Sequence, residues 1–318
     1  MTWNPADLPD QTGRTVVVTG ATAGIGYFAA EQLATAGADV VLASRSATKL
    51  RVAEEAIRGQ VPGASLRSVV IDLASFASVD AAAAELAALP RLDGILLNGG
   101  AMTIGRRNHT ADGLPMLLGT HVAANVRLVA RLIPALAASA TAHDTIGRIV
   151  HTSTGFVNLV SLSVDDVRRV PRIGIAAYTK AKTVTEVFAF ELDRRLRASG
   201  SPVASLVVRP GVGVDAKTPQ RPGIRDSTTP YQRNPYTRWA QGKDTAAWSA
   251  VRALTDPAAQ GGDYFAPAGG ITGEPVAVEL NPRTATPAGD LAERVWAQLE
   301  EIAGVRVALP LESEKGEA

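Results

Sequence analysis

The feature that most constrains the fold is a strand, a glycine-rich turn and a helix in direct succession near the N-terminus. The β-branched run 15–19 is typical of a buried parallel strand, and a helical pattern covers 27–36. Between them, Gly20 permits a sharp turn, Gly24 lets the backbone approach a pyrophosphate, and Gly26 lets the helix pack tightly on the strand. The helix start offers free N–H groups and a positive dipole end. This order predicts a dinucleotide site; a glycine-rich turn without a ligand is the alternative.

Apolar strands alternate with helical patterns along the 318-residue chain. The predicted strands are 16–19, 40–43, 68–71, 95–98, 149–152 and 203–208, and the helical segments include 27–36, 47–58, 79–88, 114–138 and 176–199. This alternation predicts an α/β fold: a Rossmann-like, doubly wound parallel sheet flanked by helices on both faces. Since no linker or internal repeat interrupts the array, we expect residues 1–318 to form a single domain.

Two long connections interrupt the alternation, at 155–175 and at 213–243. The second is rich in proline and carries Tyr231, Tyr236 and Trp239. Because ligands in this fold class bind beyond the carboxyl ends of the strands, we interpret 213–243 as a substrate-covering loop. A poorly ordered surface loop is the alternative. The charged residues 312–318 are expected to form a frayed tail.

Composition excludes several classes of protein. The net charge is +1 with no basic tract, which argues against a nucleic-acid partner, and the absence of cysteine excludes disulfides and thiolate chemistry. We see no signal peptide and no apolar run long enough to span a bilayer, so we expect a soluble cytoplasmic protein without a membrane partner. The four histidines lack metal-ligand spacing, and no metal site is predicted.

Tyr178 and Lys182 are four residues apart within a helical pattern, so both side chains lie on one face. An ammonium close to a phenol favours the phenolate, and we therefore expect Lys182 to lower the pKa of Tyr178 from its usual value near ~10. Such a hydroxyl can give a proton to a carbonyl oxygen or take one from an alcohol. Taken alone, the pair also fits a solvated helix face.

The combination of these motifs resembles the short-chain dehydrogenase/reductase superfamily, most closely its retinol-dehydrogenase-like and protochlorophyllide-reductase-like branch. The resemblance rests on a Thr-Gly-x-x-x-Gly-x-Gly turn, an Asn after the fourth strand, a hydroxyl residue after the fifth, and Tyr-x-x-x-Lys. Further similar segments are 71–75, 110–113, 262–265 and the terminal helix around Val295-Trp296. The resemblance extends over nearly the whole chain.

The resemblance implies a cofactor site as well as a fold. Asp72 would bind the adenine amino group, Asn98 would fix the loop beside the ribose, and Pro210-Gly211 would lie under the nicotinamide. The family usually reads Asn-Asn-Ala-Gly from Asn98, so Gly99 and Ala101 depart from it, and it often has Thr where Asp215 stands. The full set of cofactor positions is Gly20, Thr22, Ala23, Gly24, Ile25, Gly26, Ser44, Arg45, Asp72, Leu73, Asn98, Gly99, Gly100, Tyr178, Lys182, Pro210, Gly211 and Gly213.

The implied catalytic set is Tyr178, Lys182, Thr154 and His121, and two of these depart from the family. Thr154 stands at the family's Ser position, where its hydroxyl can still bind a substrate oxygen; Ser153 is the rival but should face the other way. His121 stands at the family's Asn position, where an imidazole could itself relay a proton near its usual pKa of ~6.5. A buried helix residue with a satisfied hydrogen bond is the alternative, and Asn125 is then the spare relay candidate.

The cofactor is predicted to be NADP(H) in preference to NAD(H). The second strand ends in Leu42-Ala43-Ser44-Arg45, without the acid that grips the ribose 2′-hydroxyl of NAD; Arg45, aided by Ser44 and Thr22, would accommodate a 2′-phosphate. A solvated surface charge is the alternative for Arg45. NADP-preferring relatives often have a base at the position of Ala23.

These features together predict an NADP(H)-dependent oxidoreductase that interconverts a carbonyl and an alcohol on a hydrophobic small molecule. One alternative is a regulatory protein that binds NADP(H) with little turnover. Another is a nucleotide-sugar epimerase or dehydratase, which is disfavoured because those relatives usually space their glycines Gly-x-x-Gly-x-x-Gly. Homo-oligomer formation is left open.

Overall fold

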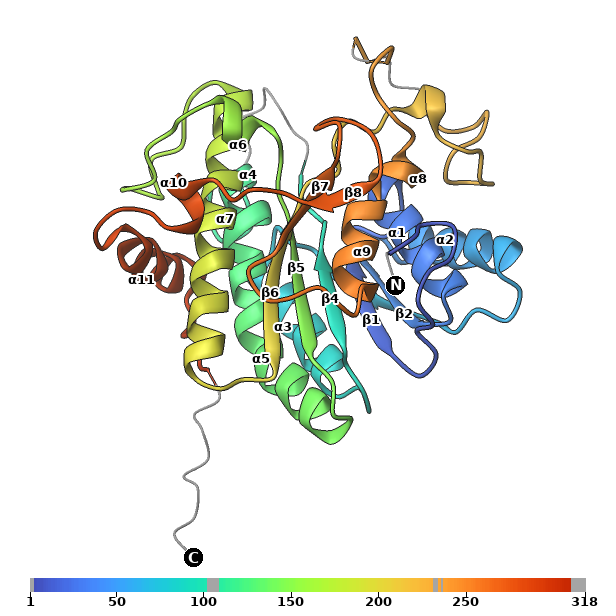
Figure 1. Cartoon of the computed structure of the whole chain (residues 1–318), viewed down its shortest axis with the longest axis horizontal. Coiled ribbons are helices and arrows are strands. Elements are labelled where there is room, and N and C mark those ends of the chain that lie inside the picture. The colour runs from blue at the N-terminus through green and yellow to red at the C-terminus, as the bar shows by residue number, and fades with distance from the viewer. Residues whose placement is uncertain (1–2, 102–108, 231–233, 236, 310–318) are drawn as a thin grey trace, which may run out of the picture.

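The computed structural model describes residues 3–101, 109–230, 234–235 and 237–309, and its centre is one eight-stranded sheet (Figure 1). The strands lie in the order β3-β2-β1-β4-β5-β6-β7-β8. β1 to β7 are parallel, and β8 runs antiparallel to β7. The strands are β1 (Thr15–Thr19), β2 (Asp39–Ser44), β3 (Leu66–Val70), β4 (Gly94–Leu97), β5 (Gly147–Thr152), β6 (Val203–Val208), β7 (Tyr264–Pro267) and β8 (Pro275–Ala277).

Helices cover both faces of the sheet (Figure 1). One face packs against α1 (Gly24–Thr35), α2 (Ala47–Gln60) and α9 (Trp248–Thr255). The other packs against α3 (Phe76–Ala87), α5 (Ala124–Ala142), α7 (Gly174–Ala198) and α11 (Leu291–Ala303). Short helices are α4 (Met116–Leu118), α6 (Phe156–Leu159), α8 (Lys243–Ala246) and α10 (Pro282–Ala285). The predicted doubly wound sheet is thus confirmed.

The sequence pattern missed two features of the fold. The helix expected over 114–138 is present as the helical run Met116–Ala142, but it contains a π-helical turn at Gly119–Ala123 between α4 and α5. A π turn inserts one residue into the helical hydrogen-bond pattern, which an apolar periodicity does not reveal. The strands β7 and β8 were not predicted; both are short, and the tight glycine-rich connection between them lacks a helical pattern.

The expectation that no segment could span a bilayer also needs correction. By length and composition alone, the helical run Met116–Ala142 is long and apolar enough to do so. However, 72% of its most apolar window is buried inside the protein. A core helix passes the same test, and α5 packs against α3 and the sheet as such a helix.

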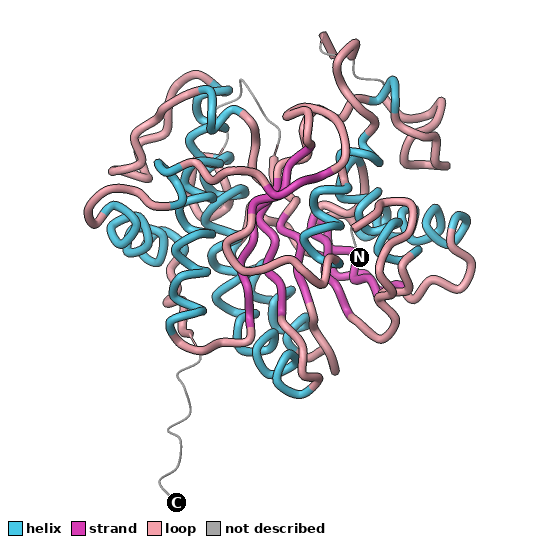
Figure 2. The backbone as a smooth tube through the Cα atoms, in the orientation of Figure 1, coloured by secondary structure: helices cyan, strands magenta, loops and turns pink. Residues whose placement is uncertain are grey.

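The segment 213–243 projects from the sheet as a long connection, drawn largely as loop in Figure 2. Its two ends are held together, because Val214 N donates to Gln241 O and Gln241 N donates to Val212 O, each at 2.9 Å. Arg221 ties it to α1 through two bonds to Glu31, of 2.7 and 2.8 Å. Tyr231, Tyr236 and the tail 312–318 lie outside the described residues, so the predicted covering role and the frayed tail stay predictions.

Candidate active site

The glycine turn between β1 and α1 is a close-packed cradle. A Cβ at Gly26 would lie 2.4 Å from Gly20 O and 2.6 Å from the Asn98 amide, and Gly20 and Gly24 have φ of +70° and +58°. The start of α1 has no acidic residue in its first turn and no side-chain hydrogen bond at its cap Ala23. This backbone can receive an anion, and it fits the diphosphate of a dinucleotide.

Asn98 joins the ends of β1 and β4 beside this turn. Its backbone N donates to Thr19 Oγ1 at 3.0 Å, and its side-chain amide donates to Thr19 O at 3.3 Å. Gly99 N donates to the same hydroxyl at 2.9 Å, and a Cβ at Gly99 would lie 2.9 Å from Leu73. The loop is therefore held by Thr19, and its glycines permit close contact with neighbouring residues.

A cavity of about 370 Å³ lies on one side of the glycine turn. It is lined from β1 by Gly20, from β2 by Ser44 and Arg45, and from the end of β3 by Asp72 and Leu73. Gly99 and Gly100, which follow β4, also line it. Predicted cofactor positions from four strand ends thus meet at one cavity, as expected for an adenosine pocket at the carboxyl edge of a parallel sheet.

The hydroxyls predicted to bind a 2′-phosphate are adjacent. Thr22 Oγ1 lies 3.2 Å from Ser44 Oγ, and Arg45 is exposed beside them at the end of β2. Sequence reasoning missed Lys49, which lies on α2 and shares a second cavity with Thr22. The available signal was its place in the first turn of the helix that directly follows Arg45 and Ser46.

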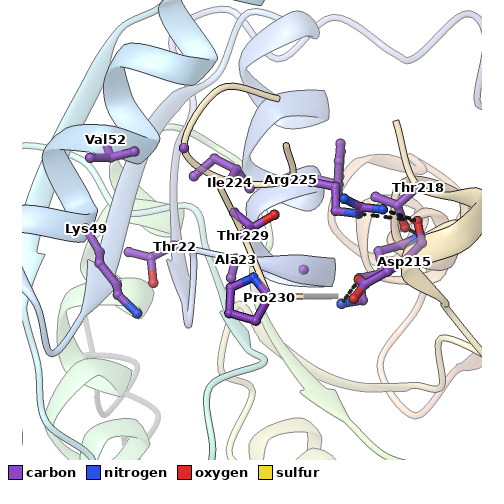
Figure 3. A pocket seen from close by; sticks show the side chains of 14 residues that line it. Thr22, Ala23, Lys49, Val52, Asp215, Thr218, Ile224, Arg225, Thr229 and Pro230 are labelled. Carbon is purple, nitrogen blue, oxygen red and sulfur yellow. Dashed lines mark hydrogen bonds and ion pairs between the residues drawn. The ribbon is translucent and has the colours of Figure 1, made fainter. Parts of the chain in front are cut away.

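The second cavity, of about 400 Å³, is also lined by the glycine turn (Figure 3). Thr22, Ala23 and Gly24 form one wall, and Asp215, Arg225 and Lys243 come from the 213–243 connection and α8. In Figure 3, Lys49 and Thr22 lie opposite Asp215 and Arg225. Three cations and one carboxylate make this an electropositive cavity.

The C-terminal end of β6 leads into the same connection. Pro210 O accepts a hydrogen bond from the Gln241 amide at 2.9 Å. Gly211 has φ +70°, and a Cβ there would lie 2.3 Å from Ile271 O. At Gly213 a Cβ would lie 3.1 Å from Ala246. These contacts hold the start of the connection against β7 and α8, but neither glycine lines the two cavities described above.

Tyr178 and Lys182 occupy one face of α7, as predicted. Lys182 is 3% exposed, and its Nζ donates to Thr152 O at 2.6 Å and lies 5.9 Å from the Tyr178 ring centroid. Burial lowers the pKa of Lys182 to about 8, opposed by the charge of Glu186. The predicted lowering of the Tyr178 pKa is wrong, because burial raises it to about 12. The ammonium is directed toward β5, so desolvation outweighs its attraction for the phenolate.

His121 lies in the π turn and packs edge-on against Tyr178, with ring centroids 5.4 Å apart. Its Nε2 is 2.9 Å from Ala101 O and therefore donates, which leaves Nδ1 as a buried acceptor with no partner among the described residues. Burial, and then the charge of Lys182, lower the His121 pKa to about 3. The expectation of a titration near pH ~6.5 is therefore wrong: this imidazole is neutral.

The two hydroxyl candidates at the end of β5 have different surroundings. Thr154 is half-buried, and its Oγ1 accepts a long hydrogen bond of 3.5 Å from Phe156 N. Ser153 is 1% exposed and donates to Glu186 at 2.5 Å. Tyr264 and Thr284 donate to the same carboxylate at 2.9 and 2.8 Å. Ser153 thus belongs to a buried cluster that joins β5, α7, β7 and α10, and Thr154 does not.

Comparison with known proteins decides the family. Residues 14–221 match the model of the short chain dehydrogenase family, and the match covers more than half of the chain. The chain belongs to the short-chain dehydrogenase/reductase superfamily. Polyprenol dehydrogenase of Mus musculus is 32% identical over 302 residues, which is 93% of this chain and 85% of that protein. Retinol dehydrogenase 13 of Homo sapiens is 32% identical over 218 residues, 68% of this chain and 63% of that one.

A crystal structure of an uncharacterised Mycobacterium paratuberculosis protein has a similar fold. Its TM-score is 0.75 at 27% identity, and the match covers 97% of this chain and all of that one. As a member of this superfamily, the chain is an oxidoreductase that uses a nicotinamide cofactor. The described residues contain no group of three His, Cys, Asp or Glu that could hold a metal ion.

Proposed function

We propose that this short-chain dehydrogenase/reductase is NADP(H)-dependent and interconverts a carbonyl and an alcohol on a hydrophobic small molecule. The observation that carries the proposal is the pairing of the half-buried Tyr178 with the buried Lys182 on α7, with the half-buried Thr154 hydroxyl at the neighbouring end of β5. When bound, the nicotinamide supplies or accepts the hydride. The protein must then orient the substrate oxygen and move one proton.

Tyr178 is the proton donor in the reduction direction. With a pKa of about 12, its hydroxyl stays protonated at neutral pH and can give its proton to an oxygen that becomes basic as the hydride arrives. Lys182 keeps a positive charge beside the ring below pH about 8, which stabilises the phenolate that remains. The Thr154 hydroxyl is available to donate to the same substrate oxygen.

Four basic or hydroxyl side chains support NADP(H) over NAD(H). Arg45 is exposed at the end of β2, and the Thr22 and Ser44 hydroxyls are 3.2 Å apart beside it. Lys49 adds a second cation in the cavity that it shares with Thr22. β2 ends in Ser44 and not in a carboxylate, so no negative charge there repels a 2′-phosphate. The lack of this repulsion contributes to NADP(H) preference together with the attraction of the cations.

A hydrophobic substrate is supported by exposed apolar side chains around the entry to α7. Leu159 and Ile173 are 78% and 69% exposed, and Phe156, Val160 and Ile175 are also exposed. Ile173 and Ile175 precede Tyr178 by less than two helical turns. The names of the two relatives, a polyprenol and a retinol dehydrogenase, agree with an apolar alcohol.

The test is a turnover screen with NADPH and NADH against ketones and aldehydes that range from small and polar to long and apolar. We expect NADPH-dependent reduction of apolar carbonyls, and Tyr178→Phe should reduce the rate at least about 100-fold while cofactor binding changes little. Turnover by Tyr178→Phe at the parent rate would contradict the assigned chemistry. Tight NADPH binding without any turnover across the screen would instead favour the regulatory alternative.

A further inference from the structure

Asp215 introduces a negative charge where a dinucleotide diphosphate should lie. It stands where the family often has Thr, and its side chain is 6% exposed in the cavity beside Thr22 and Gly24. A carboxylate at that place opposes an anionic ligand. Some other group must therefore compensate for its charge if the cofactor is to bind.

Lys243 is that group. Its Nζ lies 2.5 Å from Asp215 Oδ1, and its side chain is 27% exposed. A Cβ at Gly24 would lie 3.6 Å from Lys243 Cδ, and one at Gly213 would lie 3.2 Å from Cγ. The lysine stem thus passes close to Gly24 of the glycine turn and to Gly213. Its ammonium is paired with Asp215, and both residues line the cavity.

The position of Lys243 is fixed from the backbone as well. Lys243 N donates to Thr218 Oγ1 at 2.9 Å, and Thr218 Oγ1 in turn donates to Val214 O at 2.8 Å. Arg225 contacts Asp215 O at 3.3 Å through its guanidinium. Asp215 and Lys243 therefore meet where the two ends of the 213–243 connection come together, and the pair is held by hydrogen bonds at both ends.

We propose that Lys243 binds the diphosphate of the cofactor directly, and that Asp215 is the residue that orients it. An ammonium has three N–H donors, so a bond to Asp215 leaves two for phosphate oxygens. The start of α1, which forms another wall of the same cavity, supplies backbone N–H groups. The Asp215–Lys243 pair has no net charge, as the family's Thr has none. Unlike Thr, it presents ammonium N–H donors to the phosphate oxygens.

The inference rests on the proposed function for its cofactor, and it can be tested without a substrate. The parent, Lys243→Met, Asp215→Asn and the double variant are titrated with NADPH by fluorescence, and with ADP and adenosine 2′-monophosphate by competition. ADP carries the diphosphate without the 2′-phosphate, whereas adenosine 2′-monophosphate carries the 2′-phosphate without the diphosphate. Lys217→Met is the matched control, because Lys217 lies in the same connection and donates to Ala240 O at 2.6 Å.

We expect Lys243→Met to weaken NADPH and ADP about 10- to 100-fold and adenosine 2′-monophosphate less than about twofold. The double variant should bind more tightly than Lys243→Met but more weakly than the parent. The inference is overturned if Lys243→Met binds ADP like the parent, or if the double variant recovers fully, since Lys243 would then only neutralise Asp215. An equal loss in Lys217→Met also overturns it. Failure of the parent to bind either NADPH or NADH would instead contradict the proposed function.

Discussion

Gly100 lies so close to His121 that the effect of Gly100→Ala on the free energy of unfolding should depend on which residue stands at position 121. A Cβ added at Gly100 would lie 2.1, 2.3 and 2.7 Å from three atoms of the His121 ring. Gly100 is not among the glycines with positive φ, so its backbone accepts an alanine. The imidazole is therefore the obstacle to Gly100→Ala, and it is 3% exposed and bonded to Ala101 O at 2.9 Å.

The magnitude follows from these contacts. Gly100→Ala should destabilise the protein by about 1–3 kcal/mol, because the buried ring must move and its hydrogen bond to Ala101 must lengthen. In a His121→Ala background the obstacle is gone. There the same Gly→Ala change should be neutral or stabilise by about 0.4–1 kcal/mol, through reduced freedom of the unfolded chain. The coupling between the two sites is then about 1–4 kcal/mol.

The assay is urea unfolding of the parent, both single variants and the double variant, with NADPH absent. Gly99→Ala is a companion measurement, since its Cβ would meet Leu73 and Thr19 but not His121, and its cost should be the same in both backgrounds. If Gly100→Ala costs the same with His121 as with alanine at that position, the ring does not occupy the space that the geometry assigns to it.

Three further predictions concern the cofactor and the proton. Arg45→Asp should weaken NADP(H) about tenfold or more relative to NAD(H), and an unchanged ratio by titration of both cofactors would remove Arg45 from the 2′-phosphate site. Thr154→Val should lose turnover with little loss of stability. Ser153→Ala should keep turnover but lower the free energy of unfolding by about 1–3 kcal/mol, because the buried Glu186 carboxylate loses a hydrogen-bond donor. Reduction rates should fall above pH about 8 as Lys182 loses its proton, with no inflection near pH ~6.5 because His121 is already neutral. An inflection there that disappears in His121→Asn would show that the imidazole titrates after all.

The sequence predicted those parts of the fold that depend on local patterns. Buried parallel strands have continuous apolar runs, and all six predicted strands correspond to strands of the sheet within one or two residues at most ends. The π turn around His121 and the short strands β7 and β8 could not be found in this way. The π turn changes hydrogen bonding without changing the apolar pattern, and β7 is defined by its pairing with β6 and β8.

The residues of the site were easier to predict than their charge states. A spacing of four residues is enough to bring Tyr178 and Lys182 to one helix face, because helix geometry fixes it. It does not specify that the ammonium donates to Thr152 O, nor that the phenol is desolvated. The ionisation of both groups depends on residues distant in sequence, and so the predicted direction of the Tyr178 pKa was wrong.

The same reasoning explains how ion pairing can conceal a departure from a family pattern. In the sequence alone, Asp215 places an unfavourable negative charge at the predicted cofactor site. Lys243 follows 28 positions later, and the sequence pattern assigns it no role. In the folded chain the two are 2.5 Å apart against the glycine turn. A change at one position therefore cannot be judged without its partner. Replacing Asp215 by the family's Thr alone removes the carboxylate that opposes an anion but also the group that orients Lys243, whereas replacing Lys243 alone takes the ammonium away from a buried carboxylate.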